Sequence, residues 1–185
     1  MTRAVEAVSQ NVGRDAGQNV TADVYLEIQQ FYAEQMPLLE ARKLVEFLET
    51  FTDDGYIEHQ PNGWKLEGKK VLLEEMSQRR GDPDKPLVAE MSAREAREGN
   101  VSYYDGLVYR YWFDRVRVRS IGDDTFLVNY QAIVSMTDRQ TGKVSFEPTT
   151  TVEDVLVRRD GRFLTRSRTI THDTPNWADK IHNPR

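Results

Sequence analysis

TDDGYIEHQPNG at residues 52–63 and VEDVLVRRDGRF at residues 152–163 are the two stretches that decide the fold of this chain. The first predicts a helix that ends and gives way to a short strand and a proline turn, since aspartate, glycine, proline and asparagine interrupt regular structure. The second, with RTITHD following at 168–173, predicts a hairpin that turns at its Asp-Gly pair. We expect the first strand to carry His59 and the hairpin to carry Asp154, both near the mouth of one cone-shaped cavity.

Three helices are predicted before the middle of the chain. Apolar and aromatic residues recur at spacings of three and four from Thr21 onward, and Pro37 is expected to break this first helix or to start a new turn. A second helix is expected to place Leu44 and Phe51 on one apolar side, and a third amphipathic helix is expected to follow Gly68.

Alternating side chains predict long strands in the second half, over residues 107–121, 125–137, 144–158 and 162–173. The first of these is expected to carry on one face Val108, Arg110, Trp112, Asp114, Val116 and Val118. A hairpin at Asp105-Gly106 is expected before it, while residues 87–100 fit a helix or a loop. Helices followed by an antiparallel meander indicate an α+β fold, a cone-shaped barrel in which N-terminal helices pack on a curved sheet around a pocket.

The composition is that of one ordinary globular domain. The chain has 185 residues, of which 38% are hydrophobic and 30% charged, enough to bury a core. Its net charge of −5 leaves no basic surplus for nucleic acid, and no stretch is apolar enough to span a bilayer. We therefore expect a cytoplasmic protein without nucleic-acid or membrane partners. The expected organisation is a flexible lead at 1–20, a domain at 21–173 and a tail at 174–185.

Neither a metal nor another cofactor is expected. The absence of cysteine excludes thiolate ligands, disulfides and a cysteine nucleophile. The three histidines do not have the spacing of a metal motif, and the chain has no glycine-rich loop for phosphates.

The chain resembles the nuclear transport factor 2-like superfamily, which includes SnoaL-like polyketide cyclases, ketosteroid isomerases, scytalone dehydratase and the β subunits of ring-hydroxylating dioxygenases. The resemblance covers roughly residues 21–173. It is carried by YLEIQQFYAEQMPLLEARKLVEFLETFTDD (25–54), the helix led by Gly68, FDRVRVRS (113–120) and EDVLVRRDGRFLTRSRTITHD (153–173). The last two stretches look most like the dioxygenase β subunit and its free-standing relatives.

This resemblance implies roles for three residues. In the ketosteroid-isomerase branch a catalytic base lies five residues after an Asp-Asp pair, and His59 occupies that position here. The branch's oxyanion-binding carboxylic acid corresponds to Asp154. Gln35 stands where the branch has a tyrosine on the first helix, and Tyr32 lies one turn earlier. His59, Asp154 and Tyr32 are therefore the candidate catalytic residues.

Each candidate has a second interpretation. A histidine titrates near neutral pH and suits a general base, but His59 could equally be a surface imidazole at a strand end. Asp154 alternates with apolar neighbours, so burial could keep it protonated as a donor, or it could form an ion pair with Arg168. The candidate substrate-binding residues, which could instead pack, pair at a rim or lie on the surface, are Tyr56, Trp64, Arg110, Trp112, Asp114, Tyr130 and Glu147.

The resemblance implies a cofactor-independent cyclase, dehydratase or isomerase of polyketide-type secondary metabolism. Acid/base catalysis would act on a small, largely apolar substrate, and the relatives' habit of packing sheets implies a homodimer or homotrimer. The alternative is a non-catalytic subunit or ligand-binding module resembling the dioxygenase β subunit, with a cavity filled by its own side chains.

Overall fold

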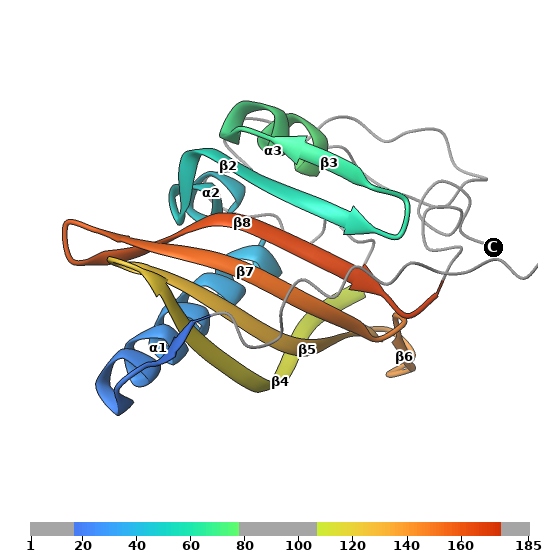
Figure 1. The fold of residues 1–185 in the computed structure, drawn as a ribbon. Helices are drawn as coiled ribbons and strands as arrows, with labels where there is room; N and C mark the ends of the chain where they lie inside the picture. Colours follow the sequence, from blue (N-terminus) through green and yellow to red (C-terminus); the bar gives the residue numbers. More distant parts are fainter. Residues whose placement is uncertain (1–16, 78–106, 175–185) are drawn as a thin grey trace, which may run out of the picture.

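A curved sheet wraps around one long helix (Figure 1). The structure is a computed structural model that describes residues 17–77 and 107–174. Its helices are α1 (Ala22–Glu40), α2 (Leu44–Glu49) and α3 (Lys69–Ser77). Its strands are β1 (Gln18–Asn19), β2 (Phe51–Gln60), β3 (Trp64–Glu67), β4 (Leu107–Gly122), β5 (Thr125–Asp138), β6 (Val144–Phe146), β7 (Thr150–Arg159) and β8 (Arg162–His172).

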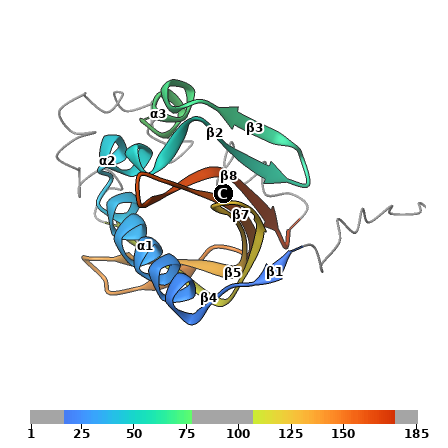
Figure 2. The ribbon, with the colours of Figure 1, turned by 60° about the vertical axis from the view of Figure 1, so that its left-hand side comes forward.

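The strands are ordered β1-β4-β5-β7-β8-β2-β3, and β6 pairs with β5. All pairs are antiparallel except β2 with β8. Figure 2 shows the strands curling around α1, with α2 and α3 beside β2 and β3. The expected α+β class with helices packed on a curved sheet is confirmed. The parallel pairing of β2 was not predicted, because β2 and β8 are distant in sequence.

Helix α1 buries one side against the sheet. Thr21 caps its first turn by accepting a hydrogen bond from the backbone N–H of Val24. The buried residues Ile28 and Tyr32 pack with apolar residues of β4, β5, β7 and β8 in the largest core cluster. The expectation that Pro37 breaks this helix is wrong. A proline near the C-terminal end removes one N–H donor, but its carbonyl still accepts from the N–H of Ala41.

A β-bulge in β4 reverses which residues face the core. Asp114 pairs with Gln131 and Arg117 with Asn129, so two residues of β4 lie opposite the single residue Tyr130. One of the two, Arg115, has a φ of 57°, in the left-handed region. Because of the extra residue, the odd-numbered side chains face inward before the bulge and the even-numbered ones after it.

This bulge corrects the expected face of the strand. Val116 and Val118 contribute to the core, as expected. The side chains expected beside them, Arg110, Trp112 and Asp114, are instead exposed on the outer face, and Phe113 packs inward. An alternating sequence pattern does not reveal an inserted residue. The pattern therefore predicts one face for both halves of the strand, although the bulge places them on opposite faces.

Two other boundaries differ from expectation. Helix α2 ends at Glu49. Phe51, which was expected on this helix, and Asp53-Asp54, which were expected to end it, already belong to β2. The strand expected over 144–158 is divided into β6 and β7 around Pro148, which has no N–H to donate to a sheet. The loop expected at 81–86, the segment at 87–100 and the hairpin at Asp105-Gly106 lie outside the described residues.

The expected domain boundaries stay predictions. Residues 17–20 are already placed against the sheet, since β1 pairs with β4, whereas residues 1–16 and 175–185 lie outside the described part. Within residues 17–77 and 107–174, no helix is long and apolar enough to cross a membrane.

Gly55 lies at the irregularity of β2 and is packed against backbone. A Cβ atom on it would lie 3.0 Å from the carbonyl oxygen of Thr52 and 3.2 Å from that of Thr165. We therefore expect Gly55→Ala to lower the free energy of unfolding by about 1–3 kcal/mol, measured by urea denaturation. Gly122→Ala is the matched control, because the nearest atom to its Cβ would be 3.9 Å away. Equal stability of the two variants would contradict the close approach.

Candidate functional site

A buried polar network lies at the centre of the fold. The Arg168 guanidinium of β8 donates from Nε to Asp154 Oδ1 of β7 at 2.9 Å and from Nη2 to Oδ2 at 2.7 Å. The same Nη2 donates to Gln35 Oε1 of α1 at 2.8 Å. Gln35 in turn donates to the hydroxyls of Thr50 and Thr165 at 2.7 and 3.1 Å. The network thus joins α1 and the end of α2 to the hairpin of β7 and β8.

Two tyrosines complete the coordination of Asp154. The hydroxyl of Tyr32 donates to Oδ2 at 2.8 Å, and that of Tyr130 donates to the same oxygen at 3.4 Å. Burial, with the neighbouring carboxylate, raises the pKa of Tyr32 and of Tyr130 well above the ordinary value. Burial alone would lower the pKa of Arg168, but Asp154 raises it above its usual value. Both phenols therefore stay protonated and Arg168 stays charged.

This geometry corrects the expected role of Asp154. Its two oxygens accept hydrogen bonds from Arg168 and from both phenols, so the group acts as an ionised acceptor. A protonated carboxyl that donates to an oxyanion would have to give up these bonds. The alternative interpretation, an ion pair with Arg168, is confirmed, and Asp154 has no exposed surface.

A second cluster lies farther along the same inner face, where β2, β3 and β8 meet. His59 of β2 is opposite Trp64 of β3 in the antiparallel pair and opposite Ile170 of β8 in the parallel pair. The Asn62 side chain accepts from the Trp64 N–H at 3.2 Å and so shapes the turn that returns Trp64 beside His59. The indole and imidazole rings are stacked, with centroids 5.3 Å apart and planes 28° apart.

His59 also meets a second histidine, which sequence reasoning did not single out. Its Nδ1 lies 3.0 Å from Nε2 of His172, at the end of β8. The two ring centroids are 5.3 Å apart and the planes differ by 15°. A nitrogen contact this much shorter than the centroid separation means that the rings meet edge to edge through a hydrogen bond. They do not stack face to face.

The environment of His172 keeps it neutral. Its imidazole is half-buried, and this desolvation lowers its pKa to about 4, although the nearby Asp173 carboxylate acts in the opposite direction. At neutral pH the pair therefore contains a neutral His172, and one nitrogen of the contact donates while the other accepts.

The two clusters lie on one face of the sheet but at different depths. Asp154 is opposite Arg168, and His59 is opposite Ile170, two residues farther along β8. Asp154 is fully buried, whereas His59 and His172 are partly exposed. His59 and Asp154 thus share the inner face, as expected, but Asp154 is fully buried, so the expectation that it lies near an opening is wrong.

One aromatic side chain covers the two tyrosines of the buried network. Phe113 packs on both tyrosines of the network, with centroids 5.6 Å from Tyr32 and 5.6 Å from Tyr130. Phe113 and Ile170 are partly exposed on this inner face. Phe113 and Ile170 therefore form a partly apolar wall, and the charged Asp154–Arg168 network is buried beneath it.

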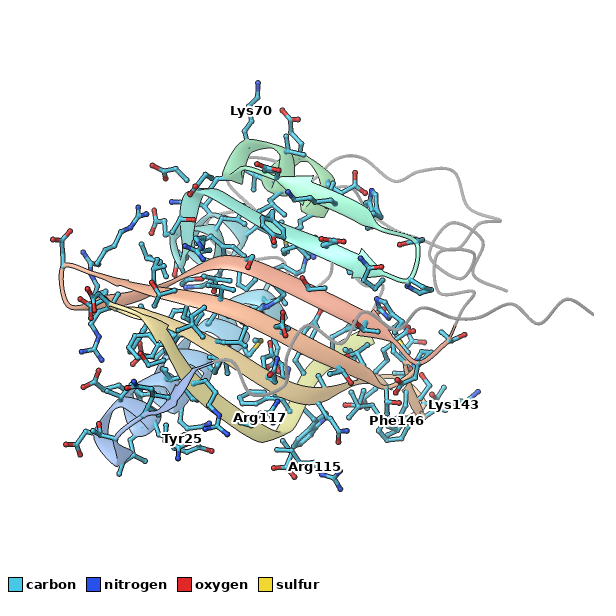
Figure 3. All side chains as sticks on the ribbon, in the orientation of Figure 1. Tyr25, Lys70, Arg115, Arg117, Lys143 and Phe146 are labelled. Atoms are coloured by element: carbon cyan, nitrogen blue, oxygen red, sulfur yellow. The ribbon has the colours of Figure 1, made fainter. Side chains whose placement is uncertain are left out.

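Three candidate substrate-binding residues lie on the opposite, outer face. Trp112 is 58% exposed and donates from Nε1 to Ser135, Arg110 pairs with Glu40 at 3.3 Å, and Asp114 accepts from the Arg115 N–H. Figure 3 shows Arg115 pointing away from the sheet on this side. A groove of about 460 Å³ on this face is lined by Trp112, Asp114, Gln131, Ile133, Thr149, Thr151 and Asp173, with Phe113, Ala132 and Thr150 between them.

The remaining candidates are divided between the two faces. Tyr56 lies under the Lys65 ammonium, 4.0 Å from the ring centroid, on the side of β2 away from Ile57. Glu147 is exposed between β6 and β7. Tyr130 faces inward but is buried in the network, so Trp64 is the candidate binding residue that adjoins His59.

The residues that sequence reasoning missed are His172 and the network partner Gln35. Gln35 stood out only because it occupies the position of a tyrosine in the ketosteroid-isomerase branch. His172 follows the predicted last strand, but its contact with His59 depends on the parallel pairing of β2 and β8. In the described part of the chain, no three His, Asp or Glu side chains cluster in a way that could hold a metal ion.

Comparison with known proteins identifies the family. The model of the SnoaL-like domain matches residues 20–169, and the chain belongs to this family within the nuclear transport factor 2-like superfamily. Aln2 from a Streptomyces species is 29% identical, with a TM-score of 0.66 over 84% of this chain and 95% of Aln2. ActVI-ORFA from Streptomyces coelicolor is 27% identical, with a TM-score of 0.63 over 82% of this chain and 98% of that protein.

A third relative was solved with a ligand. The Catenulispora acidiphila protein in complex with S-DNPA is 27% identical, with a TM-score of 0.64 over 85% of this chain and 99% of that protein. No match was found among curated protein sequences.

The buried pair generates a prediction about stability. Asp154→Leu or Arg168→Met alone leaves an unpaired buried charge, so each is expected to lower the free energy of unfolding by about 3–5 kcal/mol. The double variant is expected to lose much less than the sum of the two. Urea denaturation of the four proteins measures this coupling, and additive losses would show that the two groups do not depend on each other.

The low pKa of His172 generates a prediction about pH. In the unfolded chain this group takes up a proton below about pH 6.5, whereas in the folded protein it stays neutral until about pH 4. Stability is therefore expected to fall as the pH drops from 6.5 to 4. The fall should be steeper in the parent protein than in His172→Gln, measured by urea denaturation at several pH values. Parallel curves would contradict the neutral, half-buried imidazole.

Proposed function

We propose that the protein is an acid/base catalyst acting on a small, largely apolar carbonyl compound of polyketide-type metabolism, with His59 as the general base. The observation that carries this proposal is the position of His59. Its imidazole is partly exposed on the inner face, beside an apolar wall, and is held between Trp64 and His172. Membership in the SnoaL-like family and a relative that was solved with the small molecule S-DNPA support a small-molecule ligand.

The proposed step is proton transfer without a cofactor. His59 removes a proton from a carbon next to a carbonyl group, and the electron pair of the broken C–H bond moves onto the carbonyl oxygen as an enolate. The proton on His59 then returns to carbon at another position. Alternatively, the enolate carbon adds to a second carbonyl group of the substrate and His59 protonates the resulting alkoxide, or the enolate expels a neighbouring hydroxyl group, which takes the proton from His59 and leaves as water. These outcomes correspond to isomerisation, cyclisation or dehydration, and a partly apolar surface suits them because it limits competing water.

The other candidates take supporting roles in this proposal. Trp64 presents its indole face beside the base and provides a flat contact for a planar substrate. Tyr32, Tyr130 and Asp154 lie beneath the site. They support Phe113 of the apolar wall and do not transfer the proton. The cytoplasmic location and the homodimer or homotrimer stay predictions.

A non-catalytic ligand-binding module is the second candidate. It is favoured by one observation: the Asp154 carboxylate, which is expected from the resemblance to take part in the chemistry, is held in a buried ion pair. This candidate predicts that the protein binds the ligand but does not exchange its protons.

Proton exchange tests the proposal. The protein is incubated in D₂O with S-DNPA and with a panel of aromatic ketones, and mass spectrometry follows deuterium uptake next to the carbonyl. We expect catalysed exchange on at least one compound, and His59→Ala should lower its rate by about 10²-fold or more. Trp112→Ala, on the outer face, is the matched control and should retain the parent rate.

Three results would contradict the proposal. Binding without exchange in the parent protein would favour the ligand-binding module. Full activity of His59→Ala would remove this residue as the base. Loss of activity in Trp112→Ala, with circular dichroism showing a folded protein, would move the site to the outer groove.

A further inference from the structure

We propose that His172 is a positioning residue that holds His59 in the tautomer with an unprotonated Nε2, the form required of a base. This inference rests on the proposed role of His59 and adds a second residue to the same site. It starts from the hydrogen bond of 3.0 Å between His59 Nδ1 and His172 Nε2.

The bond can be formed in two ways. If His59 Nδ1 donates, its Nε2 carries no proton and can accept one from a substrate. If His172 Nε2 donates, His59 Nδ1 is the acceptor and its Nε2 carries a hydrogen, so that nitrogen of His59 cannot serve as a base. The reactivity of His59 therefore depends on which partner donates.

The surroundings favour the first arrangement once a proton is transferred. When His59 Nε2 takes a proton, both nitrogens of His59 carry hydrogen, and Nδ1 must donate. His172 Nε2 is then the acceptor of a charge-assisted hydrogen bond, which is stronger than the neutral one. Because His172 is half-buried and resists protonation, the added proton stays on His59 and is available for return to the substrate.

The neighbouring rings favour this contact. The planes of the two imidazoles differ by only 15°, and the indole of Trp64 stacks against His59 with its centroid 5.3 Å away. The negative face of the indole further favours a positive charge on His59. His172 thus does for His59 what an orienting acceptor does for the base of a catalytic triad, but as a neutral group.

The tautomer of His59 can be measured directly in the protein without substrate. Long-range ¹H–¹⁵N spectra of ¹⁵N-labelled protein near neutral pH distinguish a protonated Nδ1 from a protonated Nε2. We expect the parent protein to hold His59 with Nδ1 protonated, and His172→Leu to release it into a mixture of tautomers. His172→Gln, whose amide oxygen can accept from Nδ1, should largely restore the parent signal. Backbone ¹H–¹⁵N spectra verify that each variant is folded.

Kinetics provide the second readout. With a compound that exchanges protons, His172→Leu should lower kcat by about tenfold or more and leave KM close to the parent value, and His172→Gln should recover most of the loss. A parent His59 with Nε2 protonated, or a tautomer unchanged in His172→Leu, would overturn the inference even if His59→Ala is inactive. Full exchange by His59→Ala would instead overturn the proposed function and leave the tautomer result standing.

Discussion

The ion pair between Asp154 and Arg168 is the interaction on which the architecture depends. Removing two charges from water costs several kcal/mol per ion, so a buried pair is tolerated only where each group finds all its partners. Here the partners come from α1, β5, β7 and β8, and they include Gln35, Tyr32 and Tyr130. An arrangement that displaces any of these elements leaves a charge or a polar group unpaired, so the network specifies how helix and sheet fit together.

The network also explains the division of the inner face. A carboxylate that accepts from a guanidinium and two phenols and has no exposed surface is out of reach of a substrate. Its role is to hold the tyrosines, and through Phe113 the wall, in fixed positions. The proposed chemistry belongs to the partly exposed end of the same face, where His59 and His172 share a hydrogen bond. The buried structural network and the proposed reactive histidines thus lie beside different residues of β8.

Much of this could be predicted from the sequence, and the failures have physical causes. The helical spacing of apolar and aromatic residues in α1 and the turn at Asp160-Gly161 follow from local periodicity and turn chemistry. The inner face of β4 did not follow, because a single inserted residue at Arg115 changes the face without changing the composition. The pairing of His59 with His172 depends on a parallel contact between segments that are far apart in the chain, which no local pattern contains.

The most direct test of the account is a crystal structure of the protein with S-DNPA bound. The account predicts the ligand on the inner face, stacked near Trp64 and within hydrogen-bond distance of His59 Nε2, with the Asp154–Arg168 pair undisturbed below it. A ligand bound in the outer groove against Trp112, or one that contacts the inner face only far from His59, would contradict it.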